Sequence, residues 1–259
     1  MGVRLAVRSR GRIAAWGLLA AVFLANYVET TVEDRLRETP VSELGYRTAR
    51  AFTEVESTVQ PEDLFANHEA TGAVAVYGYS VAYFFLFPIV ALGLALALTC
   101  HREEWPLRVF ARALAIDYAV SLPFFLLFPV PERWAYPESG AILLSDRWSA
   151  ALIAALRPMS GLDNCFPSFH VSMSVVLVAV AFLAGVRFRG SIAALGLAVV
   201  ISTFGLGIHW LPDIVAGVAT GILSVALALR FEAAGRSRKD LSRWARPAGV
   251  TGAPFSARG

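Results

Sequence analysis

A segment with the sequence DNCFPSFH, residues 163–170, joins a histidine to small polar residues at the start of a long apolar run. Pro167 favours the first position of a helix, and the amides that follow it would then lack intrahelical partners. Such a helix end binds phosphate. Ser168 would add a hydroxyl donor, and His170 could protonate a leaving group. The alternative is that Asn164 and Ser168 only cap the helix.

A second segment, STFGLGIHWLPDIVAG, covers residues 202–217. Pro212 predicts a helix that begins near Leu211, with Asp213 in its first turn and His209 just before it. A carboxylate that accepts the N–H of an imidazole holds one tautomer and leaves the other ring nitrogen free to attack an electrophile. The alternative is that Asp213 only caps the helix.

The composition places these residues in a membrane protein. Hydrophobic residues make up 56% of the chain and charged residues 17%, and the mean hydropathy is +0.57. These values exceed what a soluble domain usually has. A spanning helix needs roughly 20 apolar residues, so the sequence predicts an all-α, six-transmembrane-helix bundle. The expected spans are 12–28, 72–99, 107–130, 166–185, 190–208 and 211–230. No small-residue cleavage site follows the first span, which favours a retained anchor over a signal peptide.

The loop charges predict the orientation of the bundle. The basic N-terminal arm, the basic tail and four loop arginines all fall on one side of a six-helix count. These loop arginines are Arg102, Arg108, Arg187 and Arg189. Because cytoplasmic loops are enriched in Lys and Arg, both termini are expected in the cytoplasm. Residues 29–71 and 131–165 then face the extracytoplasmic side, together with His170 and His209.

The domain organisation follows from these spans. Residues 1–235 are expected to form one membrane-embedded domain, with 29–71 as an extracytoplasmic insertion that contains a short amphipathic helix at 41–59. The basic tail, 236–259, is rich in Gly, Pro and Ser and is expected to be disordered. Without a nucleic-acid-binding motif, it should contact anionic lipid headgroups. The excess of arginine over lysine indicates a G+C-rich genome, so a prokaryotic plasma membrane is the expected location.

The two histidine segments resemble the phosphatidic acid phosphatase type 2 superfamily, a family of six-helix membrane enzymes. Its motif Pro-Ser-x-His matches residues 167–170. Its motif Ser-Arg, five residues, His, three residues, Asp matches Ser202, His209 and Asp213, but Thr203 stands in place of the Arg. Of its remaining motif, Lys, six residues, Arg-Pro, the Arg-Pro pair is present and the Lys is not.

Those departures resemble one branch of the superfamily. Arg157 and Pro158 match the Arg-Pro pair, whereas Ala150 occupies the Lys position. The run Asp-Asn-x-Phe-Pro-Ser-x-His, combined with Thr203, looks like the inositol phosphorylceramide synthase type, in which Thr commonly stands at that Arg position.

The resemblance implies a role for each matching residue. His209 would be the nucleophile that attacks phosphorus, and Asp213 would orient it. His170 would protonate the departing oxygen and then activate the acceptor, which is water or an alcohol. Ser168 and Arg157 would hold phosphate oxygens. The family needs no metal or other cofactor, and the sequence by itself shows no convincing metal cluster.

Further residues near these motifs have alternative roles. Arg147 is a candidate for the missing cation, because it lies one helical turn before Ala150 if 145–156 is helical; alternatively it reaches toward outer headgroups. Asp163 could orient Arg157 or His170, or be solvated. Asn164, Ser202 and Thr203 are supporting residues.

Two features of the predicted spans are best explained by structure. Asp117, an acid within the third span, is expected to pair with a polar or cationic group. A stripe of Tyr77, Tyr79 and Tyr83 is expected to serve packing and the membrane interface.

Three functions from different classes are compatible with these patterns. The favoured one is a lipid phosphatase or phosphotransferase at the outer leaflet. The second is a catalytically silent relative that acts as a transporter or scaffold, because Ala150 and Thr203 depart from the family. A proton-coupled carrier using His170, His209 and Asp117 is disfavoured, because carriers bind substrate near the midplane and these histidines lie at helix ends. The lipid, the acceptor and the oligomeric state stay open.

Overall fold

The computed structural model describes residues 2–36, 40–59, 72–147 and 164–235. Within these ranges the regular elements are all helical, which confirms the all-α prediction for this part of the chain. The α-helices are α1 (Gly2–Leu36), α2 (Val41–Val59), α3 (Ala73–Val81), α4 (Phe87–Thr99), α5 (Trp105–Leu127), α7 (Phe169–Leu183), α8 (Arg189–Gly205) and α9 (Leu211–Ala234). Short helices are η1 (Ala82–Leu86), η2 (Arg133–Ala135) and η3 (Pro137–Ser139).

Each of the six expected spans contains a helix, but the helices differ in length. Four described segments are long and apolar enough to cross a membrane: Arg10–Val32, Ala73–Thr99, Trp105–Leu127 and Leu211–Ala234. The second of them joins α3, η1 and α4. Helices α7 and α8 have 15 and 17 residues, which at 1.5 Å per residue is about 22–26 Å against a hydrocarbon core of about 30 Å. The protein is therefore a helical membrane protein, while the count of six spans and the cytoplasmic termini stay predictions.

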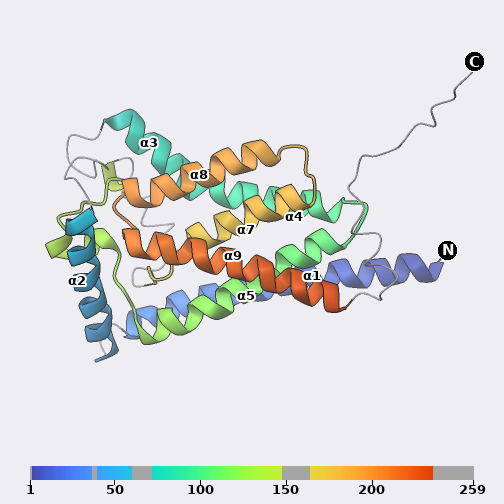
Figure 1. Cartoon of the computed structure of the whole chain (residues 1–259), viewed down its shortest axis with the longest axis horizontal. Coiled ribbons are helices and arrows are strands. Elements are labelled where there is room, and N and C mark those ends of the chain that lie inside the picture. The colour runs from blue at the N-terminus through green and yellow to red at the C-terminus, as the bar shows by residue number, and fades with distance from the viewer. Residues whose placement is uncertain (1, 37–39, 60–71, 148–163, 236–259) are drawn as a thin grey trace, which may run out of the picture.

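The long helices lie side by side along the long axis of the molecule, and α2 crosses one end of them (Figure 1). Helix α5 packs against α1, α7 and α9, and α7 also packs against α8 and α9. Helix α2 has the bounds expected for the amphipathic segment and buries Gly45, Ala49 and Glu56. It contacts α9, so a segment of the insertion covers the end of the bundle where α9 begins.

Two glycines of α9 let α7 approach closely. A Cβ atom at Gly217 would lie 2.6 Å from the carbonyl oxygen of Ser168, and one at Gly221 would lie 2.6 Å from that of Ser172. Both distances are well inside van der Waals contact, so these positions require a residue without a side chain. The close approach places the start of α7 beside the start of α9.

The opposite end of the bundle is held by charged groups. Glu232, near the end of α9, accepts hydrogen bonds from Arg108 and Arg112 of α5, and its side chain is buried. Arg12 of α1 donates to the carbonyl of His101 and lies 4.0 Å from Glu104. These contacts join α1, α5 and α9 at the end that the loop charges predict to be cytoplasmic.

Candidate active site

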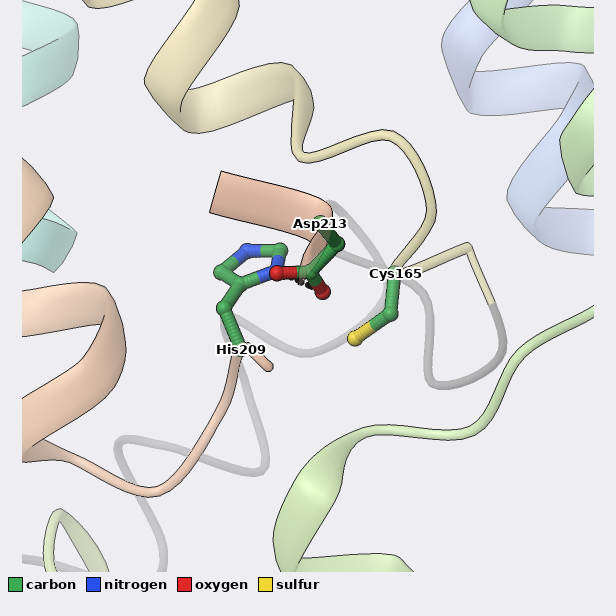
Figure 2. A group of neighbouring side chains, drawn as sticks. All are labelled: Cys165, His209 and Asp213. Carbon is green, nitrogen blue, oxygen red and sulfur yellow. Dashed lines mark hydrogen bonds and ion pairs between the residues drawn. The ribbon is translucent and has the colours of Figure 1, made fainter. Parts of the chain in front are cut away.

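His209 and Asp213 form a buried pair at the start of α9 (Figure 2). Helix α9 begins at Leu211, with Pro212 and Asp213 in its first turn, as the sequence predicted. His209 Nδ1 lies 3.1 Å from Asp213 Oδ2, and His209 Nε2 lies 3.3 Å from Ser168 Oγ. An N–H on Nδ1 satisfies the carboxylate, and this assignment leaves the lone pair of Nε2 directed at Ser168.

The start of α7 differs by two residues from the prediction. Pro167 was expected at the first helical position, but α7 begins at Phe169 and Ser168 is its N-cap, with Oγ accepting from the Val171 amide at 3.4 Å. The Ser168 amide donates to the carbonyl of Asp213 at 3.1 Å. This bond holds Ser168 in an extended conformation and uses an amide that was expected to face phosphate. The first-turn amides of Phe169 and His170 remain at the helix end.

His170, the second residue of α7, faces the same space as His209. The two ring centroids lie 5.9 Å apart. The His170 ring stacks on Tyr83 at 4.3 Å between centroids, and its Nδ1 lies 3.2 Å from the Tyr83 hydroxyl. Tyr83 therefore contacts the site and does more than the packing expected of it. It belongs to the same stripe as Tyr77 and Tyr79, and nothing in the sequence indicated that Tyr83 would contact the histidine.

Cys165 is a further neighbour that the sequence did not indicate. Its Sγ donates to the carbonyl of Ile208 at 3.4 Å. One ligand atom from each of Cys165, His209 and Asp213 lies within 4.8 Å of the others, so this buried group could hold a metal ion (Figure 2). Catalytic zinc sites likewise have three protein ligands. Here, however, the imidazole and the carboxylate already bond to each other, so a metal would have to displace that hydrogen bond.

The sequence was also compared with known protein families, curated proteins and solved structures. A family model described as the PAP2 superfamily matches residues 49–227. The chain belongs to the PAP2 superfamily. The match confirms the resemblance inferred from the sequence at the level of the superfamily, but not its inositol phosphorylceramide synthase branch. PAP2 members are generally phosphatases or phosphotransferases, which supports an enzyme of this class. No curated protein and no solved structure matches the chain.

Ser202 and Thr203, the predicted supporting residues, lie near the end of α8, and the backbone carbonyl of Thr203 contacts the segment that contains His209. Their hydroxyls donate to carbonyls of their own helix, those of Ala198 and Val200. The carbonyl of Thr203 accepts from the amides of Ile208 at 3.2 Å and His209 at 3.0 Å. The residue that replaces the motif Arg therefore holds the turn that positions His209.

Asn164 ties the site segment to α1. Its Nδ2 donates to Oε2 of Glu29, a buried residue of α1, at 3.4 Å. This contact contradicts the alternative in which Asn164 caps α7, since Ser168 is the N-cap. Nothing in the sequence indicated this contact, because Glu29 is distant along the chain and was expected to begin the insertion 29–71.

Of the two cations expected around phosphate, Arg147 lies within the described residues and Arg157 does not. Arg157 and Asp163 lie outside the described residues, as does Ala150. Arg147 is described and exposed, and its reach toward the site stays a prediction.

A buried ion pair lies on the α2 side of the site. Glu56 of α2 accepts from the amide of Leu211 at 2.7 Å and from Arg133 Nε at 2.9 Å. Burial raises the pKa of Glu56, and the Arg133 charge and the two hydrogen bonds oppose this rise. The Arg133 guanidinium also lies over the Phe204 ring, 4.8 Å from its centroid. The pair fixes the residue where α9 begins, and Asp213 follows two positions later.

Asp117 has the polar partner that the sequence predicted. Its Oδ2 accepts from Ser172 Oγ at 2.7 Å, in the buried contact between α5 and α7. Ser172 is one turn below the N-cap of α7, so this bond steadies the helix that presents His170.

Proposed function

We propose that this protein is an integral membrane lipid phosphatase that cleaves a phosphate monoester through a phosphohistidine on His209. The observation that supports it best is the arrangement of Asp213, His209 and Ser168, with the His170 ring beside them. It combines an oriented nucleophile, a hydroxyl donor and a second imidazole for proton transfer.

The reaction would proceed in two balanced steps. His209 Nε2 attacks phosphorus, the P–O ester bond breaks, and His170 gives a proton to the departing oxygen. His170 then takes a proton from water, the water oxygen attacks phosphorus, and the N–P bond breaks to release inorganic phosphate. Ser168 Oγ and the first-turn amides of α7 would stabilise the phosphoryl oxygens, together with Arg157. All these groups belong to the protein, so the proposed reaction needs no metal or other cofactor.

The loop charges support an extracytoplasmic position for this site, at the outer leaflet of a prokaryotic plasma membrane. The substrate would be a lipid phosphate within the bilayer.

A second candidate is transfer of the phosphoryl headgroup to a lipid alcohol. It is favoured by the run from Asp163 to His170 together with Thr203, which resembles the inositol phosphorylceramide synthase type. The first step is the same, and an alcohol replaces water in the second. A silent scaffold or transporter is the third candidate, suggested by Ala150 and Thr203, and the intact pair of His209 and Asp213 argues against it.

The test is phosphate release from a panel of lipid phosphates by purified protein in detergent with a chelator. His209→Ala should reduce release to background. His101→Ala changes a half-buried histidine at the other end of the bundle and should leave release unchanged. Lipid alcohols added in parallel should leave phosphate release dominant; phosphoryl transfer at the expense of release would favour the synthase instead. A folded protein without either turnover would support the silent relative.

A further inference from the structure

An apolar cavity of about 500 Å³ begins at the two histidines and extends into the bundle. Its volume lies within the range of about 300–1,000 Å³ that is typical of small-molecule sites. Its walls come from α1, from η1 and α4, from α5 and from the start of α7. The two catalytic imidazoles of the proposed reaction line one end, so whatever fills the cavity lies next to the reacting atoms.

The polarity of the walls changes along the cavity. On α1, Asn26 lies toward the site, because the neighbouring Glu29 bonds to Asn164. At the far end, Trp16 of α1 donates to Thr99 of α4. Between these ends α1 contributes Leu19, Ala20, Val22 and Phe23, and α4 contributes Phe87, Ala91 and Ala95. A molecule that matches this lining has a polar head beside the histidines and one long apolar chain along the apolar walls. The proposed function makes this head a phosphate.

The helix geometry gives the length of this chain. From Asn26 to Trp16, α1 advances about 15 Å at 1.5 Å per residue, and from Phe87 to Ala95, α4 advances about 12 Å. A zigzag of C–C bonds of about 1.5 Å fills such a length with about ten to twelve carbons. The cavity suits one chain of this length.

The cavity also has an apolar rim. Phe23 of α1 and Leu92 of α4 both line it, and both are more than half exposed, at 62% and 55%. In a membrane these exposed apolar side chains face lipid, so a chain could enter between α1 and α4 without crossing water. This rim favours an apolar chain from the bilayer over a soluble molecule.

One wall comes from outside the region shared with the family. The PAP2 match begins at residue 49, whereas α1 ends at Leu36. We propose that α1, with Ala20 at the middle of its wall, sets the length of the single apolar chain that the substrate places in this cavity. This inference rests on the proposed function for its enzymatic test and has a second test that does not need turnover.

The enzymatic test compares single-chain lipid phosphates of increasing chain length. In the wild type, kcat/KM should rise with chain length and level off near twelve carbons. The rise should be up to about fourfold per added methylene, the factor that corresponds to the transfer free energy of one CH₂. Ala20 lies about 9 Å from Asn26 along α1, so Ala20→Phe should move the plateau to about seven carbons. Ala21→Phe is the matched control, because Ala21 is adjacent to Ala20 and exposed like it, but does not line the cavity. Identical profiles for the two variants would overturn the proposal.

The second test uses a nonhydrolysable alkyl phosphonate with a photoreactive group at the end of a twelve-carbon chain. Crosslinks, mapped to single residues, should fall at Trp16 and Ala95 and should be lost in Ala20→Phe. Crosslinks of equal intensity at Ile13 and Ile89, which are exposed and do not line the cavity, would mean that bulk lipid is being labelled, and would overturn the proposal. Specific crosslinks without any phosphate release would instead overturn the proposed function and leave the chain site intact.

Discussion

Asp213 determines which nitrogen of His209 faces the phosphate position. The carboxylate occupies Nδ1, so Nε2 is presented to Ser168. The pair is buried, and the two residues are separated by one turn of chain, so neither can rotate away without leaving a buried polar group unpaired. The nucleophile is thus oriented by a neighbour close to it in sequence.

Asp213→Asn tests this orientation. The amide keeps the size of the side chain but removes the charge that favours the required tautomer and stabilises the imidazolium. We expect kcat to fall by roughly 10²–10⁴-fold with a smaller change in KM. Steady-state kinetics on a lipid phosphate would measure this, with Asp146→Asn, at an exposed position, as the control. A kcat within about twofold of the wild type would contradict the role of Asp213.

Cys165 gives a second prediction at this scale. Because its thiol lies with His209 and Asp213 in a group that could hold a metal, Zn²⁺ should inhibit phosphate release, and a chelator should restore it. Cys165→Ala should raise the inhibitory Zn²⁺ concentration by at least roughly 10-fold, because losing even an outer-shell partner of a metal ligand costs about 10–100-fold in metal affinity. Cys100→Ala serves as the control, since Cys100 lies exposed at the other end of α4. Equal Zn²⁺ sensitivity in both variants would rule out this group as the inhibitory site.

At the scale of elements, the contact between α7 and α9 brings the two halves of the site together. Gly217 and Gly221 allow the backbones to approach, and the Ser168 amide bonds to the carbonyl of Asp213. The N-cap of one helix and the first turn of the other are therefore held in register by main-chain atoms. A change in this contact should affect both stability and activity.

Gly221→Ala should destabilise the protein. Its Cβ would lie 2.6 Å from the backbone oxygen of Ser172 and 2.9 Å from Val175 Cβ, and backbone cannot move aside as a flexible side chain can. We expect a loss of about 1–3 kcal/mol, as for other overpacked sites, visible as a lower Tm in detergent. Gly93→Ala is the control: nothing lies within 4 Å of its Cβ position in α4, so it should gain up to about 1 kcal/mol from helix propensity. Equal Tm values for the two variants would contradict the close packing.

For the whole molecule, the two ends of the bundle have different chemistry. Helix α2 crosses the end of the bundle where α9 begins (Figure 1), and His209 and Asp213 lie at that start of α9. Near the other end of α9, Glu232 bonds to Arg108 and Arg112. Arginines near the second end are the signal from which the cytoplasmic side was inferred. The orientation in the membrane therefore decides whether the proposed site meets extracytoplasmic or cytoplasmic substrate.

The exposed thiol of Cys100 can report this orientation. It follows α4 at the end away from the site, whereas Cys165 is buried beside His209. A membrane-impermeant maleimide should label the protein only after cells that express it are permeabilised, because we expect Cys100 on the cytoplasmic side. Cys100→Ala should abolish the labelling. Full labelling of intact cells would reverse the proposed topology and the leaflet of the site.

The sequence by itself determined what depends on neighbours along the chain. Composition and apolar runs predicted a helical membrane protein, the amphipathic pattern predicted α2, and Pro212 predicted the start of α9 with Asp213 beside His209. The superfamily could be inferred from the sequence for the same reason, because the residues that carry the resemblance lie close together along the chain.

Only the tertiary structure decided which distant residues meet. Helix α7 begins two residues later than the sequence predicted, because the amide of Ser168 bonds to the carbonyl of Asp213, which lies in another helix. Tyr83 lies beside His170, and Cys165 lies beside His209, because the helices pack together. The spacing of residues within one helix does not predict these contacts. The apolar cavity likewise exists only between helices, because its volume is what their side chains leave unfilled when they pack.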